Sequence, residues 1–180
     1  MELVVNTIDG PAGIAPPIAA GVSAESILDI RLVARMDQVS MVRTFLEQFL
    51  GSSSPDPDLL ARVTVAAHEL LENAAKYSSQ PGARLRTGIE KRQGRWCGWV
   101  EVANQGAPEH VDDLRMTVQE LEDPATAVEM YQIDMLCSAL KGDASGLGLA
   151  RIRAELEMDL SLRLEGETVW VTATASTELL

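Results

Sequence analysis

Residues 68–78 read His-Glu-Leu-Leu-Glu-Asn-Ala-Ala-Lys-Tyr-Ser, and this stretch decides how the rest of the chain is interpreted. At about 100° per residue of an α-helix, Glu69, Asn73 and Lys76 fall on one narrow stripe. An amide oxygen suits Mg²⁺, an ammonium group suits phosphate oxygens, and a carboxylate can take a proton from a nucleophile. The stripe is therefore compatible with phosphate chemistry. A solvated helix face with polar i,i+3 and i,i+4 pairs has the same pattern.

The helix that carries this stretch has its own start and stop signals. Asp56 is a good N-cap residue, and Pro57 suits the first turn. Pro81-Gly82 is expected to end the helix. The residues predicted to face the core are Leu60, Val63, Ala67, Leu71, Ala74 and Ser78.

Outward from this helix, apolar periodicity predicts the remaining elements. Upstream, a half-buried strand runs through Leu28–Leu32, and an amphipathic helix opens near Asp37 and ends at 51–54. Downstream, the expected elements are a hairpin around Gln93-Gly94, helices over 111–121, 125–140 and 147–156, and a hairpin around Gly166.

This order predicts an α/β (α+β) two-layer sandwich, with the helices on one face of a mixed, mainly antiparallel sheet. The other face would be open or covered by a partner, which antiparallel sheets tolerate. Residues 8–23 are rich in Pro, Gly and Ala, and residues 1–23 are expected to form an extended arm or tail, with a short strand at 3–5. The domain itself is expected to span 24–180.

Two further motifs carry backbone or polar groups suited to a nucleotide. Ser145-Gly146-Leu147-Gly148-Leu149 directly precedes a helix, where glycines let the backbone approach a phosphate. Asn104 and Gly106 follow a strand, where a polar side chain could reach an adenine edge. Each motif alone is explained equally well by an ordinary turn.

Together, the three motifs resemble the N-box, G1-box and G2-box of the GHKL ATPases, the superfamily of histidine kinases and Hsp90. The resemblance covers about residues 25–175 and implies a histidine-kinase-like ATPase fold that binds ATP and Mg²⁺. It implies that Asn73 is the metal ligand, that Lys76 contacts phosphate, and that Asn104 and Gly106 hold the adenine end. It also implies that Gly146, Leu147 and Gly148 supply backbone on the phosphate side, and that a lid at about 107–145 closes over the phosphates.

Within that superfamily, the spacing Glu69-x-x-x-Asn73 looks like the anti-sigma-factor serine kinases of partner-switching systems. In those proteins this Glu acts as the base toward a protein serine. The likeness implies a cytoplasmic ATP- and Mg²⁺-dependent regulator whose partner is a small antagonist protein or a sigma-factor-like protein, with a homodimer as an allowed form. The end of the motif resembles sensor histidine kinases instead, but neither His68 nor His110 is placed as a phosphoacceptor.

Two departures from the family pattern keep a second function open. Asn104 stands where the family has Asp, and Pro108 replaces the last glycine of the G1 motif. An amide oxygen still accepts a hydrogen bond from adenine, but about 1–2 kcal/mol of charge-assisted strength is lost. Pro108 stiffens the turn. The alternative is a degenerate GHKL domain that acts only as a protein–protein interaction switch.

The composition excludes some classes of partner but does not identify the partner. A formal net charge of −12 argues against nucleic-acid and anionic-membrane surfaces, which need basic patches. The two cysteines and two histidines suffice for neither a disulfide framework nor a zinc site. The start of the chain has no signal-peptide pattern, and 180 residues suit one domain.

Overall fold

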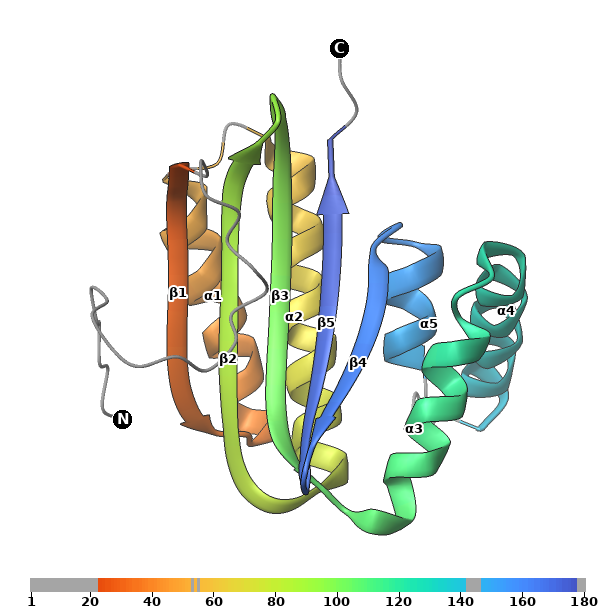
Figure 1. Cartoon of the computed structure of the whole chain (residues 1–180). Helices are drawn as coiled ribbons and strands as arrows, with labels where there is room; N and C mark the ends of the chain where they lie inside the picture. The colour runs from red at the N-terminus through yellow and green to blue at the C-terminus, as the bar shows by residue number, and fades with distance from the viewer. Residues whose placement is uncertain (1–22, 53, 55, 142–146, 178–180) are drawn as a thin grey trace.

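The computed structural model describes residues 23–52, 54, 56–141 and 147–177 of the 180-residue chain. Within them, five antiparallel strands form one sheet, in the order β1-β2-β3-β5-β4 (Figure 1). The strands are β1 (Ser23–Val33), β2 (Ser78–Arg92), β3 (Arg95–Gly106), β4 (Asp159–Glu165) and β5 (Thr168–Ser176). The helices are α1 (Met36–Gly51), α2 (Pro57–Tyr77), α3 (Pro108–Glu120), α4 (Pro124–Lys141) and α5 (Leu147–Ala154).

This arrangement confirms the predicted sandwich, with one refinement. Every strand pair among the described residues is antiparallel, so the sheet is not mixed. The predicted arm, 1–23, lies outside the described residues except for Ser23, which already belongs to β1. The strand expected at 3–5 also lies outside them.

The two predicted hairpins are present, and their turns use the expected residues. Gln93 and Gly94 join β2 to β3 with φ angles of 49° and 85°, the left-handed region that a tight two-residue hairpin requires. Gly166 joins β4 to β5 with φ of 61°.

Helix α2 starts as predicted but ends earlier. The Asp56 carboxylate accepts hydrogen bonds from the backbone N–H groups of Asp58 and Leu59, at 2.9 and 3.1 Å. The expected end at Pro81-Gly82 and the expected core position of Ser78 are wrong. The reason is that Ser78 is already extended and pairs with Gly106 of β3, so β2 follows the helix without a loop.

The core lies between the sheet and α1, α2 and α5. Helix α2 packs on the central strand β3, where a Cβ added at Gly98 would lie 2.6 Å from Val63 Cγ2 and 3.0 Å from Leu59 Cδ1. The even-numbered residues of β3, such as Val100 and Val102, therefore face the helices and are buried. The buried side of α2 is broader than the predicted stripe and comprises Leu59, Val63, Thr64, Ala66, Ala67, Leu70, Leu71 and Ala74.

The predicted lid region, 107–145, is helical through Lys141, beyond which residues 142–145 lie outside the described set. Its apolar anchors were expected only from Met130 to Leu140. Met130 and Tyr131 do pack against the core, but the anchors begin earlier: Val118, Leu121 and Ala127 are buried, whereas Leu136 is 67% exposed. These three buried residues lie where α3 ends and α4 begins. No helix among the described residues is long and apolar enough to cross a membrane.

The close approach of β3 to α2 can be tested at Gly98. Gly98→Ala should lower the free energy of unfolding by about 1–3 kcal/mol, because the added methyl overpacks against Val63 and Leu59. Urea unfolding followed by circular dichroism measures the change. Gly82→Ala is the matched control, since a Cβ at Gly82 meets nothing within 4 Å. Equal stability of the two variants would contradict this packing.

Candidate functional site

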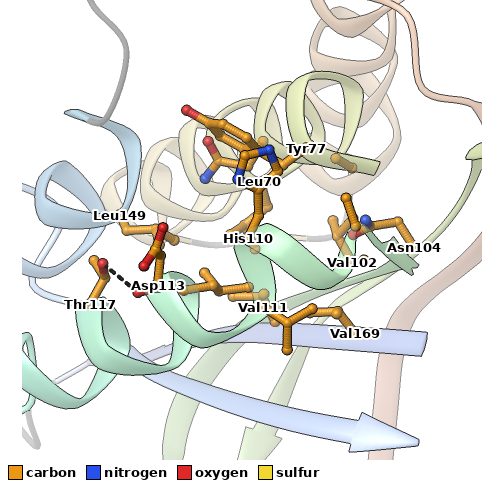
Figure 2. Close-up of a pocket in the computed structure, with 16 residues that line it drawn as sticks. Leu70, Tyr77, Val102, Asn104, His110, Val111, Asp113, Thr117, Leu149 and Val169 are labelled. Carbon is orange, nitrogen blue, oxygen red and sulfur yellow. Dashed lines mark hydrogen bonds between the residues drawn. The ribbon is translucent and has the colours of Figure 1, made fainter. Parts of the chain in front are cut away.

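A cavity of about 270 Å³ lies between α2, α3, the start of α5 and the ends of β3 and β5 (Figure 2). Most of its lining is apolar, and it comes from Leu70, Ala74, Val102, Val111, Leu114, Leu149, Val169 and Val171. The polar side chains in the lining are Asn73, Tyr77, Asn104, His110, Asp113 and Thr117. Such a cavity suits a flat, largely apolar ligand with a few polar edges.

Parts of all three sequence motifs meet here. Asn73 comes from α2, Asn104 and Gly106 from the end of β3, and Leu149 from the first turns of α5. In Figure 2, Asn104 lies at one end of the group of side chains and Leu149 at the other. Leu147 begins α5 and is half-buried, while Gly146 lies outside the described residues.

Gly148 is in direct contact with the polar stripe of α2. A Cβ added at Gly148 would lie 2.8 Å from Glu69 Oε2 and 3.6 Å from Asn73 Nδ2. Any side chain at this position would therefore fill the space beside Glu69 and Asn73. The glycine keeps that space open.

Asn104 is held at the end of β3 by its neighbours. Its Nδ2 donates a hydrogen bond to the Gln105 carbonyl oxygen at 3.3 Å, so the carboxamide oxygen is left as the accepting group. The Ser78 and Ser79 hydroxyls donate to the same carbonyl at 3.0 and 3.2 Å. These contacts fix the strand end against the junction of α2 and β2.

Glu69 lies beside the cavity and does not line it. Its Oε1 is 3.0 Å from Arg151 Nη1 of α5, and its side chain is 14% exposed. Arg151 also binds Glu155 through Nε, at 2.8 Å. The predicted base is thus one end of an ion-pair chain, and its Oε2 is the oxygen that faces Gly148.

The predicted role of Lys76 receives no support from its position. Lys76 Nζ is 3.1 Å from Glu72 Oε2, and Glu72 Oε1 is 3.2 Å from His68 Nε2. Lys76 is not among the residues that line the cavity. Glu72, one turn earlier on the helix, pairs with the ammonium group on the outside of α2, and the expected contact of Lys76 with phosphate stays a prediction.

Helix α3 supplies cavity residues that the sequence analysis missed. His110, Asp113 and Thr117 recur at three to four residues, the spacing of one helix face, but the whole region had been assigned to a lid. The rings of His110 and Tyr77 meet edge to face, with centroids 5.3 Å apart. The Asp113 carboxylate places negative charge at the cavity and disfavours phosphate on the α3 side.

Helix α4 is connected to Glu69 through three polar contacts in series, which the sequence analysis also missed. The Tyr131 hydroxyl of α4 donates to Glu155 Oε2 at 2.6 Å, and Glu155 binds Arg151. This hydrogen bond to a carboxylate raises the pKa of Tyr131, and the Arg151 guanidinium lowers the pKa of Glu155. Tyr131, Glu155, Arg151 and Glu69 thus link α4, α5 and α2 in one chain.

The fold, with its helices on one face of an antiparallel sheet, agrees with the comparisons with known proteins. Residues 32–174 match the family model of the histidine kinase-like ATPase domain. The chain therefore belongs to the histidine kinase-like ATPase family, which confirms the family expected from the three motifs.

A solved structure shares the fold. The chain is similar to one in the crystal structure of the SiaB–SiaC complex from Pseudomonas aeruginosa, with 14% identity and a TM-score of 0.55, covering 85% of this chain and 92% of that chain. A search of curated proteins gave no match.

The contact between α4 and α5 can be tested by titration. Because Glu155 raises the pKa of Tyr131, Glu155→Gln should lower that pKa toward the ordinary tyrosine value. NMR of the Tyr131 ring resonances against pH measures it. Glu157→Gln is the control, since Glu157 pairs with Arg62 instead. If the two variants titrate alike at Tyr131, the link between α4 and α5 is not formed in solution.

Proposed function

We propose that this protein is an ATP- and Mg²⁺-binding regulatory kinase that phosphorylates a serine of a small partner protein, as anti-sigma-factor serine kinases do. The observation that carries the proposal is the single cavity that joins Asn73, Asn104 and the start of α5. Family membership supports a nucleotide as the ligand. The cytoplasm is the proposed location.

The cavity fits the nucleoside end of ATP. Its volume of about 270 Å³ lies near the lower end of ligand pockets, roughly 300–1,000 Å³, so it suits a base and sugar better than a whole nucleotide. In the proposed pose the adenine lies between Leu70 and Val171, and the Asn104 carboxamide oxygen accepts from the adenine amino group. The triphosphate then extends past Asn73 toward Gly148, away from Asp113.

The polar stripe of α2 fits a metal that arrives with the nucleotide. Mg²⁺ commonly takes one or two protein oxygens and completes its shell with phosphates and water. Asn73 carries one such oxygen; the atom that lies beside the space left open by Gly148 is its Nδ2, so the carboxamide must turn over to present the oxygen to the metal. No group of three or more His, Cys, Asp or Glu side chains in the described residues could hold a metal by itself. Metal binding is therefore expected only together with ATP.

In the proposed transfer, the partner's serine hydroxyl attacks the γ-phosphorus, ADP leaves, and the serine proton passes to Glu69. Arg151 holds Glu69 Oε1, so Oε2 is the oxygen available to take the proton. Arg151 acts here as a positioning residue. The chain's own contribution is orientation of the hydroxyl and acceptance of its proton.

The proposed partner is a small antagonist protein or a sigma-factor-like regulator, and a homodimer is part of the proposal. The similar solved structure is a complex of two proteins, SiaB and SiaC, which supports a protein partner for this fold.

The second candidate is a switch that binds proteins without turning over ATP. Asn104 and Pro108 favour it. Asn104 lacks the negative charge that the family's Asp brings to the adenine end, and Pro108 is a rigid first residue of α3. The position of Lys76 on Glu72 also favours it, because no lysine of α2 then reaches the cavity. Calorimetric titration with ATP, with and without Mg²⁺, separates the two candidates.

The roles proposed for Asn73 and Glu69 predict different losses. Asn73→Ala should weaken Mg²⁺-dependent ATP binding and turnover together, because a metal ligand is gone. Glu69→Gln should leave ATP affinity within a few-fold and reduce phosphate transfer by ~10²–10⁴-fold, since a base acts mainly in the transition state. Calorimetry and transfer from γ-labelled ATP to the partner measure the two effects.

Matched melting temperatures of the two variants would exclude unfolding as the cause. Equal loss of ATP affinity in both would contradict the separate roles. Absence of ATP binding by the unmodified protein up to millimolar concentration would reject the kinase and leave the protein–protein switch.

Restoring the family's residues at the adenine end is predicted to increase the affinity for ATP. Asn104→Asp combined with Pro108→Gly should strengthen ATP binding by about 1–2 kcal/mol, roughly tenfold in Kd, because a carboxylate replaces an amide as acceptor. Gln105→Glu is the control, as it adds the same charge on the opposite face of β3. A gain in the control alone, or in neither variant, would mean that Asn104 does not contact adenine.

A further inference from the structure

The cavity offers different polar groups to a ligand on its different sides. Its α3 side is lined by residues from one face of that helix: His110, Val111, Asp113, Leu114 and Thr117. The rest of the lining comes from α2, from the first turns of α5 and from the ends of β3 and β5. In the view of Figure 2, Asp113 lies between Asn104 at one end of the group of side chains and Leu149 at the other.

Helix α3 is held in place by the end of β3. A Cβ added at Gly106 would lie 2.8 Å from Val111 Cγ2, so Val111 packs directly on the backbone of the strand. The Ala107 N–H group donates a hydrogen bond to the Tyr77 carbonyl oxygen at 3.3 Å. These contacts fix the start of α3, and with it the position of Asp113, about half a helical turn after Val111.

Asp113 and Thr117 offer hydrogen-bond acceptors to a ligand and no donors. An ionised carboxylate only accepts, and no cation or hydrogen-bond donor among the described residues binds the carboxylate of Asp113. The Thr117 hydroxyl already donates its proton to the backbone carbonyl oxygen of Asp113 at 2.9 Å, so its Oγ1 is left to accept. A ligand group that lies against this part of the cavity must therefore be a donor.

The start of α5 has the opposite preference. The first N–H groups of a helix have no partner within it and favour negative charge. Gly148 keeps space open there, and Glu69, which borders that space, is paired with Arg151 at 3.0 Å. Acceptors such as phosphate oxygens are thus favoured beside α5, whereas donors are favoured beside Asp113. A nucleotide carries both kinds of group, the acceptors on its phosphates and the donors on its sugar.

On the basis of the proposed function, which places a nucleotide in the cavity, we propose that Asp113 and Thr117 bind the hydroxyl groups of the ribose. The sugar joins the base to the triphosphate, and Asp113 lies between the adenine end at Asn104 and the start of α5. The two ribose hydroxyls are neighbouring donors, and the two oxygens of one carboxylate can accept from both.

The substrate class that follows is a ribonucleoside triphosphate with both ribose hydroxyls free. A deoxyribonucleotide leaves an acceptor of Asp113 or Thr117 without its donor. A nucleotide with a phosphate on a ribose hydroxyl brings negative charge against the carboxylate and is repelled. Asp113 is thus a specificity-determining residue, and the proposed transfer to the partner's serine makes no other use of it.

The test compares the affinities of the full chain for ATP and for its 2′-deoxy and 3′-deoxy analogues, by calorimetry with Mg²⁺ present. The unmodified protein should bind ATP about tenfold more tightly than at least one analogue, the lower end for a hydrogen bond to a charged group because Asp113 is exposed. In Asp113→Ala this preference should disappear. The ratio of affinities is the informative quantity, because loss of the negative charge affects all these triphosphates alike.

Asp112→Ala is the matched control. It removes the same charge from the neighbouring position of α3, but the Asp112 side chain is 83% exposed and does not line the cavity. The preference for ATP over the analogues should therefore stay as in the unmodified protein. Loss of the preference in both variants would overturn the proposal, because the effect would then come from the charge of α3 and not from contact with the sugar.

The remaining outcomes separate this proposal from the proposed kinase. Equal affinity of the unmodified protein for ATP and both analogues would overturn the role of Asp113 and leave the kinase standing. Weaker binding of all the nucleotides by Asp113→Ala, with the preference for ATP unchanged, would also overturn it, and is the result expected of a metal ligand. Absence of binding for ATP and both analogues up to millimolar concentration would reject both proposals.

Discussion

The packing of α2 on β3 is the contact on which the rest of the structure depends. Gly98 has no room for a Cβ because Val63 and Leu59 lie against the strand. This close approach fixes the rotation of α2: with one side in the core, its stripe of Glu69 and Asn73 is turned toward α5. It also fixes the alternation along β3, so that Asn104 faces the cavity while Trp99 and Glu101 face the other side of the sheet. This one contact between α2 and β3 therefore determines which side chains face the cavity and which face the other side of the sheet.

The second organising feature is the ion-pair chain from α2 through α5 to α4. Arg151 joins Glu69 to Glu155, and Tyr131 adds α4 to the chain. Partly exposed ion pairs contribute little to the stability of a fold, so this chain is better understood as setting geometry. It holds one carboxylate oxygen of Glu69 and leaves the other beside Gly148. The position of α4 and the orientation of Glu69 are therefore not independent of each other.

Most of the fold could be predicted from the sequence, because periodicity and turn residues act locally. The Gln93-Gly94 hairpin, the Asp56 cap of α2 and the order of elements all follow from such signals. The family motifs also placed Asn73 and Asn104 in one cavity. The errors arose where a distant contact overrides a local one. Ser78 leaves the helix because it pairs with Gly106. Arg151 and Tyr131 could not be found at all, since their partners are remote in sequence.

The absence of a loop between α2 and β2 has a consequence for how quickly a bound molecule could leave. Tyr77 ends α2 and Ser78 begins β2, and the Ser78 and Ser79 hydroxyls donate hydrogen bonds to the Gln105 carbonyl oxygen of β3. The walls that α2 and β3 give to the cavity are therefore joined directly to each other. Those walls cannot separate without breaking the sheet. The remaining lining comes from Leu149 of α5 and from α3. Val118 of α3 is buried, while most other residues of that helix are exposed. Entry and exit are thus expected to be one-sided, and the residence time of an occupant will depend on how long α3 stays docked rather than on motion of the sheet.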